Sequence, residues 1–86
     1  MNYYLFSAVN RCKPCRLLVD LLDEKIPNWK KYIKYVDVDN CSKEDEQLSR
    51  KLGVLRIPAF GTDTTLLKAS SYLDIFKEIK SICIGV

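Results

Sequence analysis

Residues 3–22 read YYLFSAVNRCKPCRLLVDLL, a stretch that joins an apolar run, a cysteine pair and a leucine-rich run. The run Tyr3–Ser7 is aromatic and apolar without polar interruption, which is typical of a strand buried on both faces. After Pro14, leucines recur at helical spacing until Pro27 forbids continuation, so we expect a helix of about three turns. Pro14 suits the opening of that helix because its missing N–H is harmless there. The pattern therefore predicts that Cys12 lies at the start of a helix that follows a buried strand.

Outward from this stretch, the chain alternates between strand-like and helix-like patterns. Residues 32–39 are rich in β-formers, with aspartates alternating with valines, and predict a second strand. Ser42 has an acidic residue three positions later, which resembles the capped start of a helix that ends near Gly53. The apolar stretch 54–60 then predicts a third strand.

The last third of the chain predicts a hairpin and a helix. Residues 61–64 form a turn, and residues 65–68 pair back as a fourth strand. A final helix starts at about Tyr72, and its apolar positions include Cys83, which we interpret as a small core residue. A strand, helix and strand in close succession normally form a parallel pair. We therefore predict an α/β fold with the order β-α-β-α-β-β-α, a central mixed four-stranded sheet flanked by three helices.

Composition indicates one small domain, residues 1–86, because a chain that is 48% hydrophobic at this length can build only one core. The net charge of +3 is spread along the chain, and we interpret the cluster Lys30, Lys31 and Lys34 as solvated, so we expect no nucleic-acid partner. No apolar run approaches the roughly 20 residues that span a bilayer, and the first residues do not resemble a secretory signal. We expect a cytoplasmic monomer with no membrane contact.

The chain contains no histidine, which excludes Cys–His nucleophile pairs and His-ligated zinc. In a reducing cytoplasm, the four cysteines favour redox or metal chemistry over two structural disulfides. Backbone N–H groups at the helix start would favour the Cys12 thiolate. Three cations, Arg11, Lys13 and Arg16, add to this effect. We predict that Cys12 attacks a substrate disulfide and that Cys15, one turn later, attacks the Cys12 sulfur to release the reduced substrate.

Two other interpretations of the cysteines remain. The Cys-x-x-Cys spacing also occurs in metal sites, so Cys12 and Cys15 could ligate zinc or an iron–sulfur cluster together with Cys41 and Cys83. Structural zinc sites usually show a second close pair, whereas Cys41 and Cys83 are isolated from each other, and we therefore expect no metal. The second alternative is a coincidental pair of inert cysteines.

Three segments together resemble the thioredoxin superfamily. Cys-Lys-Pro-Cys at 12–15 looks like the Cys-Gly-Pro-Cys of thioredoxins, residues 36–40 are similar to the second-strand signature, and residues 53–58 resemble the approach to a cis-proline. The resemblance implies a thioredoxin-like fold in which Pro58 is cis and faces the cysteine pair. It also implies that Ile57 pairs with the backbone of an extended substrate. The alternative is that Pro58 is an ordinary edge-strand or turn proline.

The resemblance also implies a function and its partners. The implied activity is that of a thiol–disulfide oxidoreductase, a protein-disulfide reductase whose only redox group is the Cys12–Cys15 pair, without a bound cofactor. Its substrates would be protein disulfides, ribonucleotide reductase among them. A thioredoxin-reductase-like flavoprotein or glutathione would supply the electrons.

The size and element order are closer to those of a glutaredoxin, so a glutaredoxin that uses glutathione is an alternative. Lys13 and Pro14 would contribute to the substrate-binding surface, and Arg11, Lys13 and Arg56 could bind the carboxylates of glutathione. Two features depart from thioredoxins: Phe6 stands where they carry a buried Asp, and no Trp precedes the cysteine pair.

Overall fold

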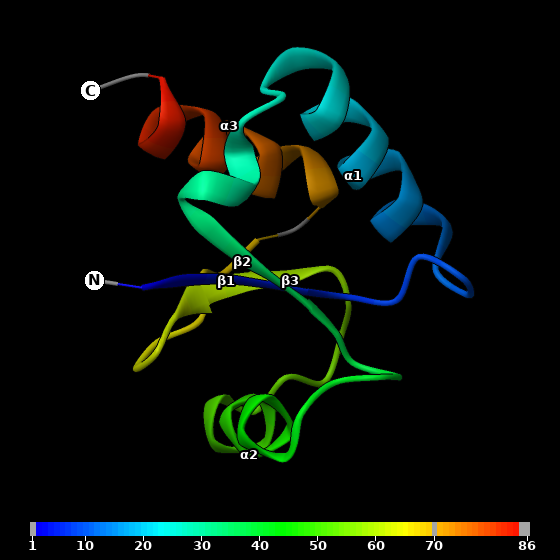
Figure 1. Ribbon diagram of the computed structural model, residues 1–86, viewed down its shortest axis with the longest axis vertical. Helices are drawn as coiled ribbons and strands as arrows, with labels where there is room; N and C mark the ends of the chain where they lie inside the picture. The colour runs from blue at the N-terminus through cyan, green and yellow to red at the C-terminus, as the bar shows by residue number, and fades with distance from the viewer. Residues whose placement is uncertain (1, 70, 85–86) are drawn as a thin grey trace.

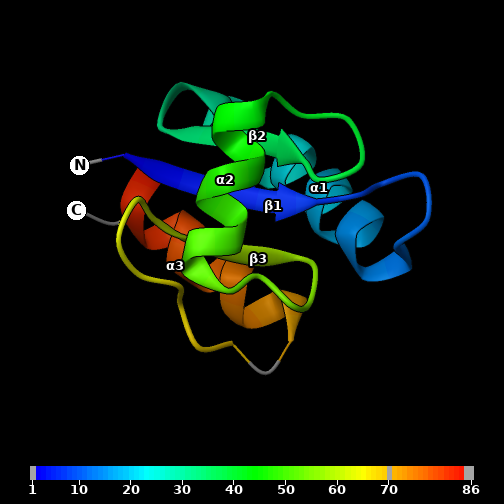
Figure 2. The same cartoon turned by 90° about the horizontal axis from the view of Figure 1, so that it is seen from below.

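A computed structural model describes residues 2–69 and 71–84 and shows three helices packed on a small sheet. Helices α1 and α3 lie on one face of the sheet, and α2 crosses the other face (Figures 1 and 2). No helix within the described ranges is long and apolar enough to cross a membrane. The elements are β1 (Tyr3–Ser7), α1 (Lys13–Lys25), the 3-10 turn η1 (Trp29–Lys31), β2 (Ile33–Asp37), α2 (Lys43–Leu52), β3 (Ala59–Thr62) and α3 (Tyr72–Cys83).

Strand β1 occupies the middle of the sheet, whose strand order is β2-β1-β3. It runs parallel to β2, with Tyr3 opposite Ile33, and antiparallel to β3, with Leu5 opposite Phe60. The parallel β1-α1-β2 unit predicted from the sequence is confirmed. Because β1 is central, its carboxyl end brings the loop before α1 to the middle of one sheet edge.

Over residues 2–69 and 71–84 the sheet has three strands, which corrects the four-stranded prediction and the order β-α-β-α-β-β-α to β-α-β-α-β-α. Residues 65–68 do turn back along β3, but their pairing is limited to a bridge between Gly61 and Leu66 and a few backbone hydrogen bonds. In one of these bonds, Leu67 N–H donates to the Phe60 carbonyl at 2.8 Å. These contacts do not extend into a ladder, so no fourth strand forms among residues 65–68.

The third strand also begins later than predicted. The apolar stretch 54–60 was expected to be a strand, yet β3 starts only at Ala59, directly after Pro58. A proline cannot donate a hydrogen bond to a sheet ladder, so the residues before it form a loop instead. This loop runs from Gly53, which ends α2 with a left-handed φ of 74°.

The main core lies between the sheet and the pair α1 and α3. Leu18 and Leu22 of α1 are fully buried there, as their helical spacing predicted. The indole N–H of Trp29 donates to the Asp23 carboxylate at 2.9 Å, which satisfies the polar atom of a fully buried ring and ties η1 to α1. Nine buried residues form this core: Leu5, Leu18, Leu22, Ile26, Trp29, Ile33, Phe60, Ile75 and Ile79. Cys83 packs against it half-buried, as expected for a small core residue.

Among the described helices, only α2 lies on the opposite face of the sheet (Figures 1 and 2). Phe6 and Val36 are buried on the sheet, whereas no residue of α2 is fully buried. The Ser42 hydroxyl accepts the N–H of Asp45 at 3.2 Å, so the capped start predicted for this helix is confirmed. Helix α2 is therefore held by its cap and a half-buried face more than by deep packing.

Candidate functional site

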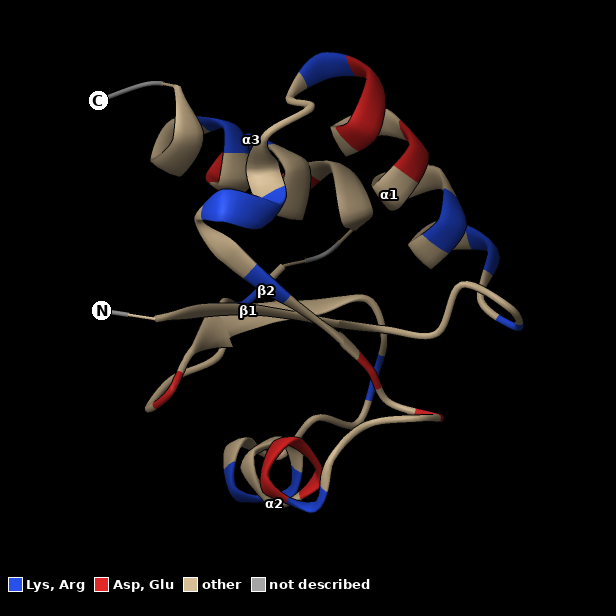
Figure 3. Cartoon of the chain, viewed as in Figure 1, with Lys and Arg blue, Asp and Glu red and all other residues tan. Residues whose placement is uncertain are grey.

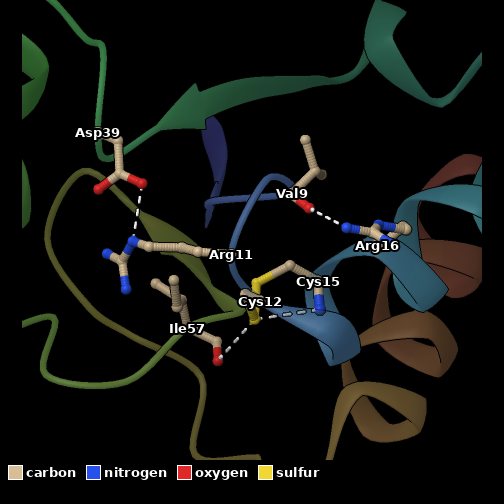
Figure 4. The surroundings of a disulfide bond; sticks show 7 residues. All are labelled: Val9, Arg11, Cys12, Cys15, Arg16, Asp39 and Ile57. Atoms are coloured by element: carbon tan, nitrogen blue, oxygen red, sulfur yellow. Dashed lines mark hydrogen bonds and ion pairs between the residues drawn. A yellow bond between two sulfur atoms is a disulfide. The ribbon is translucent and has the colours of Figure 1, made fainter.

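The candidate site is a disulfide between Cys12 and Cys15 at the start of α1 (Figure 4). Cys12 is the N-cap residue, and Pro14 occupies the first turn, as predicted. The carbonyl of Ala8, just beyond β1, accepts the N–H groups of Arg11 at 3.1 Å and Cys12 at 2.9 Å. These bonds fix the turn between the central strand and the helix, and they place the cysteine pair at the sheet edge.

Burial distinguishes the two cysteines. Cys12 is half-buried, whereas Cys15 is 0% exposed. The backbone N–H of Cys15 donates to Cys12 Sγ at 3.2 Å. A hydrogen bond from an amide to sulfur, together with the positive end of the helix dipole, favours a thiolate at Cys12 once the disulfide is reduced. The more accessible sulfur is therefore also the one at the positive end of the helix.

Positive charge gathers at the start of α1 (Figure 3). Lys13 and Arg16 lie in this segment, both exposed, and the first turn contains no acidic residue. One Arg16 nitrogen donates to the Val9 carbonyl at 3.2 Å, which keeps its guanidinium near the loop. Both cations add to the electrostatic preference for a Cys12 thiolate.

The loop before β3 reaches the cysteine pair. Cys12 Sγ lies 3.6 Å from the carbonyl oxygen of Ile57, and the Ile57–Pro58 peptide bond is cis, as the resemblance implied. Both residues are half-buried. The backbone beside the sulfur is thus within reach of any chain that approaches Cys12.

A hollow of about 310 Å³ opens beside the disulfide. It brings together four of the residues singled out in the sequence: Pro14, Arg56, Ile57 and Pro58. Lys13 and Arg11 do not line it. Its other wall comes from the far end of the chain. Ala69 and Ser71 lie where glutaredoxins have a Gly-Gly turn near glutathione, whereas Tyr72 and Ile75 were not indicated by the sequence.

Arg11 makes a contact that the sequence did not indicate. Its Nε lies 2.7 Å from Oδ2 of Asp39, which follows β2 (Figure 4). The hydrogen bond from Arg11 holds the pKa of the Asp39 carboxyl below its ordinary value, and the same bond raises the pKa of Arg11. Asp39 belongs to the 36–40 segment that resembles the second-strand signature, and this was the available signal for its place near the cysteines.

The other two cysteines are free thiols, and both are half-buried. Burial raises the pKa of each thiol, and nearby Asp45 and Glu46 raise that of Cys41 further. Among the described residues, no three Cys, Asp or Glu side chains lie close enough together to hold a metal ion. The structure does not gather the four cysteines in the way that the metal-site interpretation requires.

Phe6, where thioredoxins carry a buried Asp, is a fully buried apolar residue of β1. The arrangement as a whole is an α/β fold that is consistent with a thioredoxin-like fold, with a Cys-x-x-Cys disulfide directly after the first strand. A disulfide in this setting is compatible with thiol–disulfide redox chemistry.

Comparisons with known proteins identify no relative of this chain. No protein-family model matches the chain, and neither the curated proteins nor the solved structures give a significant match. What this site can do therefore follows from its own residues and geometry.

Proposed function

We propose that the protein is a thiol–disulfide oxidoreductase that reduces disulfides in other proteins, with Cys12 as nucleophile and Cys15 as resolving cysteine. One observation carries the proposal: a half-buried helix-capping sulfur is bonded to a fully buried one beside an open hollow. A catalytic pair needs one sulfur that is accessible to the substrate and a second, more buried sulfur that can attack the first.

The reaction starts from the reduced pair. The Cys12 thiolate attacks one sulfur of a substrate disulfide, so a Cys12–substrate bond forms and the other substrate sulfur leaves as a thiolate that takes a proton from water. Cys15 then loses its proton to water and attacks Cys12 Sγ, and the second substrate sulfur leaves as a thiolate that takes a proton from water. The Cys12–Cys15 disulfide forms, and the second substrate thiol is released. Two electrons have passed from the protein to the substrate.

The substrate segment would lie along the loop before β3. Its backbone would meet that of Ile57, whose carbonyl oxygen already faces Cys12 Sγ, and its side chains would enter the hollow beside Pro14. Arg56 on the wall of the hollow suits a carboxylate of the substrate. Enzymes that form a disulfide in each turnover, such as ribonucleotide reductase, are candidate substrates.

The oxidised pair needs an electron donor, for which a flavoprotein reductase and glutathione are the candidates. The hollow with Arg56 favours testing glutathione first, because that tripeptide carries two carboxylates. We expect Arg56→Gln to raise the glutathione concentration at which the disulfide is reduced at half its maximal rate if glutathione binds there. An unchanged requirement would favour the flavoprotein.

The Cys15→Ser variant tests the role assignment. It retains the nucleophile but lacks the resolving thiol, so it should accumulate a mixed disulfide between Cys12 and a disulfide-bonded test protein, detectable as a mass increase. Cys12→Ser should form none and should lose reductase activity, whereas Cys41→Ser is the matched control and should reduce the test protein like the unmodified chain. A folded Cys15→Ser protein without any mixed disulfide would contradict the proposal.

A redox titration gives the direction of electron flow. The protein is equilibrated in glutathione buffers, the thiols are alkylated, and mass spectrometry locates the disulfide. A Cys12–Cys15 couple at or below about −230 mV supports a reductant, and a value near about −120 mV contradicts that role in favour of an oxidant.

A further inference from the structure

The ion pair between Arg11 and Asp39 adjoins the cysteine pair without being part of it. Both side chains are largely exposed, at 60% and 46%, yet their contact is short, at 2.7 Å. Figure 4 shows the Arg11 guanidinium turned toward Asp39 and away from the two sulfur atoms. The cation that immediately precedes Cys12 in the sequence is thus held by a carboxylate.

The fold fixes that carboxylate beside the loop. Val38 N–H donates to the Ser7 carbonyl at 2.9 Å, so the end of β2 stays alongside the end of β1. Asp37 Oδ1 then accepts the N–H of Asp39 at 3.0 Å, which shapes the turn after the strand. Because the carboxyl ends of parallel strands meet at one sheet edge, Asp39 faces the loop that carries Arg11.

The charges near Cys12 come from four segments, the first of which is the loop between β1 and α1 that carries Arg11. Lys13 and Arg16 belong to α1, Arg56 belongs to the loop before β3, and the acidic groups at the end of β2 are Asp37 and Asp39. Asp39 disfavours the Cys12 thiolate in two ways. It neutralises Arg11, the cation next to Cys12 in the sequence, and it adds a negative charge of its own.

We propose that Asp39 is a positioning residue that, through Arg11, restrains the Cys12 thiolate and so keeps the Cys12–Cys15 couple reducing. The inference rests on the proposed function. A stabilised thiolate stabilises the reduced protein and makes the disulfide a stronger oxidant. A residue that opposes the thiolate therefore pushes the couple toward electron donation, which is the direction a protein-disulfide reductase requires.

The Asp39→Asn variant tests this role because it keeps the size and one acceptor oxygen of the side chain but removes the charge. We expect the Cys12 pKa, measured as the pH dependence of its alkylation rate, to fall by about half a unit. The equilibrium with glutathione, at a pH above the Cys12 pKa, should shift up to about threefold toward the reduced protein. Both effects should shrink in 1 M salt, where the screening length is about 3 Å.

Two further variants separate the electrostatic role from a structural one. Glu46→Gln removes one negative charge from the exposed Glu46–Arg50 pair on α2 and should leave the Cys12 pKa unchanged. Arg11→Gln, added to Asp39→Asn, should raise the Cys12 pKa again, because the released cation is then gone. If Asp39→Asn lowered the Cys12 pKa only by loosening the loop before α1, the added Arg11→Gln substitution would not raise that pKa again.

The outcomes distinguish the inference from the function on which it rests. A reductase whose Asp39→Asn variant has an unchanged Cys12 pKa and an unchanged glutathione equilibrium overturns the role of Asp39 and leaves the function intact. A shift of equal size in Glu46→Gln overturns it as well. A protein that forms the couple but reduces no protein disulfide overturns the proposed function, while the pKa comparison still reports on Asp39.

Discussion

At the scale of single residues, burial separates the two sulfurs that share the disulfide. Cys12 is half-buried, and its Sγ accepts a hydrogen bond from the Cys15 N–H. Cys15 is fully buried. We expect limiting iodoacetamide to alkylate Cys12 of the reduced protein before Cys15, because the thiolate is the reactive form and must be accessible. Peptide mass spectrometry measures the order. Equal rates for the two cysteines would be inconsistent with this geometry.

The free thiol of Cys41 should respond to pH differently from Cys12. Its pKa is raised above the ordinary value, by burial first and then by Asp45, Glu46 and Asp37. The thiolate fraction falls as pH drops below the pKa, so at pH 7 Cys41 should be almost entirely protonated and react slowly. Its alkylation rate should keep rising above the ordinary thiol pKa, whereas that of Cys12 should already have levelled off. The expectation would be contradicted if the alkylation rate of Cys41 levelled off at the same pH as that of Cys12, or at a lower pH.

At the scale of elements, α2 depends on its cap. The Ser42 hydroxyl accepts Asp45 N–H, and no α2 residue is fully buried, so little packing compensates for loss of the bond. We expect Ser42→Ala to lower the free energy of unfolding by about 1 kcal/mol. Urea denaturation followed by circular dichroism measures the change.

The matched control for this cap is Ser81, an exposed serine inside α3. Ser81→Ala should leave the stability unchanged or raise it slightly, because alanine is the better helix former. If both substitutions have the same effect, the capping bond contributes nothing to α2.

At the scale of the whole molecule, stability comes from the core between the sheet and the pair α1 and α3. Two adjacent leucines of α1 test this. Leu18 is 0% exposed in that core, while Leu17 is 41% exposed. We expect Leu18→Ala to cost about 3 kcal/mol of unfolding free energy, from lost burial and the cavity left behind. Leu17→Ala should cost well under half as much, and similar losses in urea unfolding would contradict the assigned core.

The sequence was sufficient for those features that depend on neighbouring residues. Leucine spacing and the two prolines located α1, apolar continuity located β1, and the two together placed Cys12 at a helix start. Each of these depends on backbone geometry within a few turns. The adjacency of β1 and β2 also followed, because a short β-α-β connection has few ways to close.

Other features required contacts across the whole chain. The predicted fourth strand is reduced to a bridge between Gly61 and Leu66, because a β-like segment becomes a strand only if it also pairs along its neighbour, which its own pattern does not determine. The far wall of the hollow, with Tyr72, lies more than fifty residues from the cysteines in the chain. No local pattern reports such a contact.

The chain by itself therefore determined where the cysteine pair lies and which cysteine caps the helix, because a helix terminus is a local structure whose N–H groups point at the residue before it. Only the tertiary structure decided what surrounds them. The partner of Arg11 is the clearest case. The sequence shows several cations close to Cys12. Only the parallel pairing of β1 and β2 places Asp39, which follows β2, in contact with Arg11. Strand pairing is a long-range event, and the charges that act on a thiolate are summed over space and not along the chain.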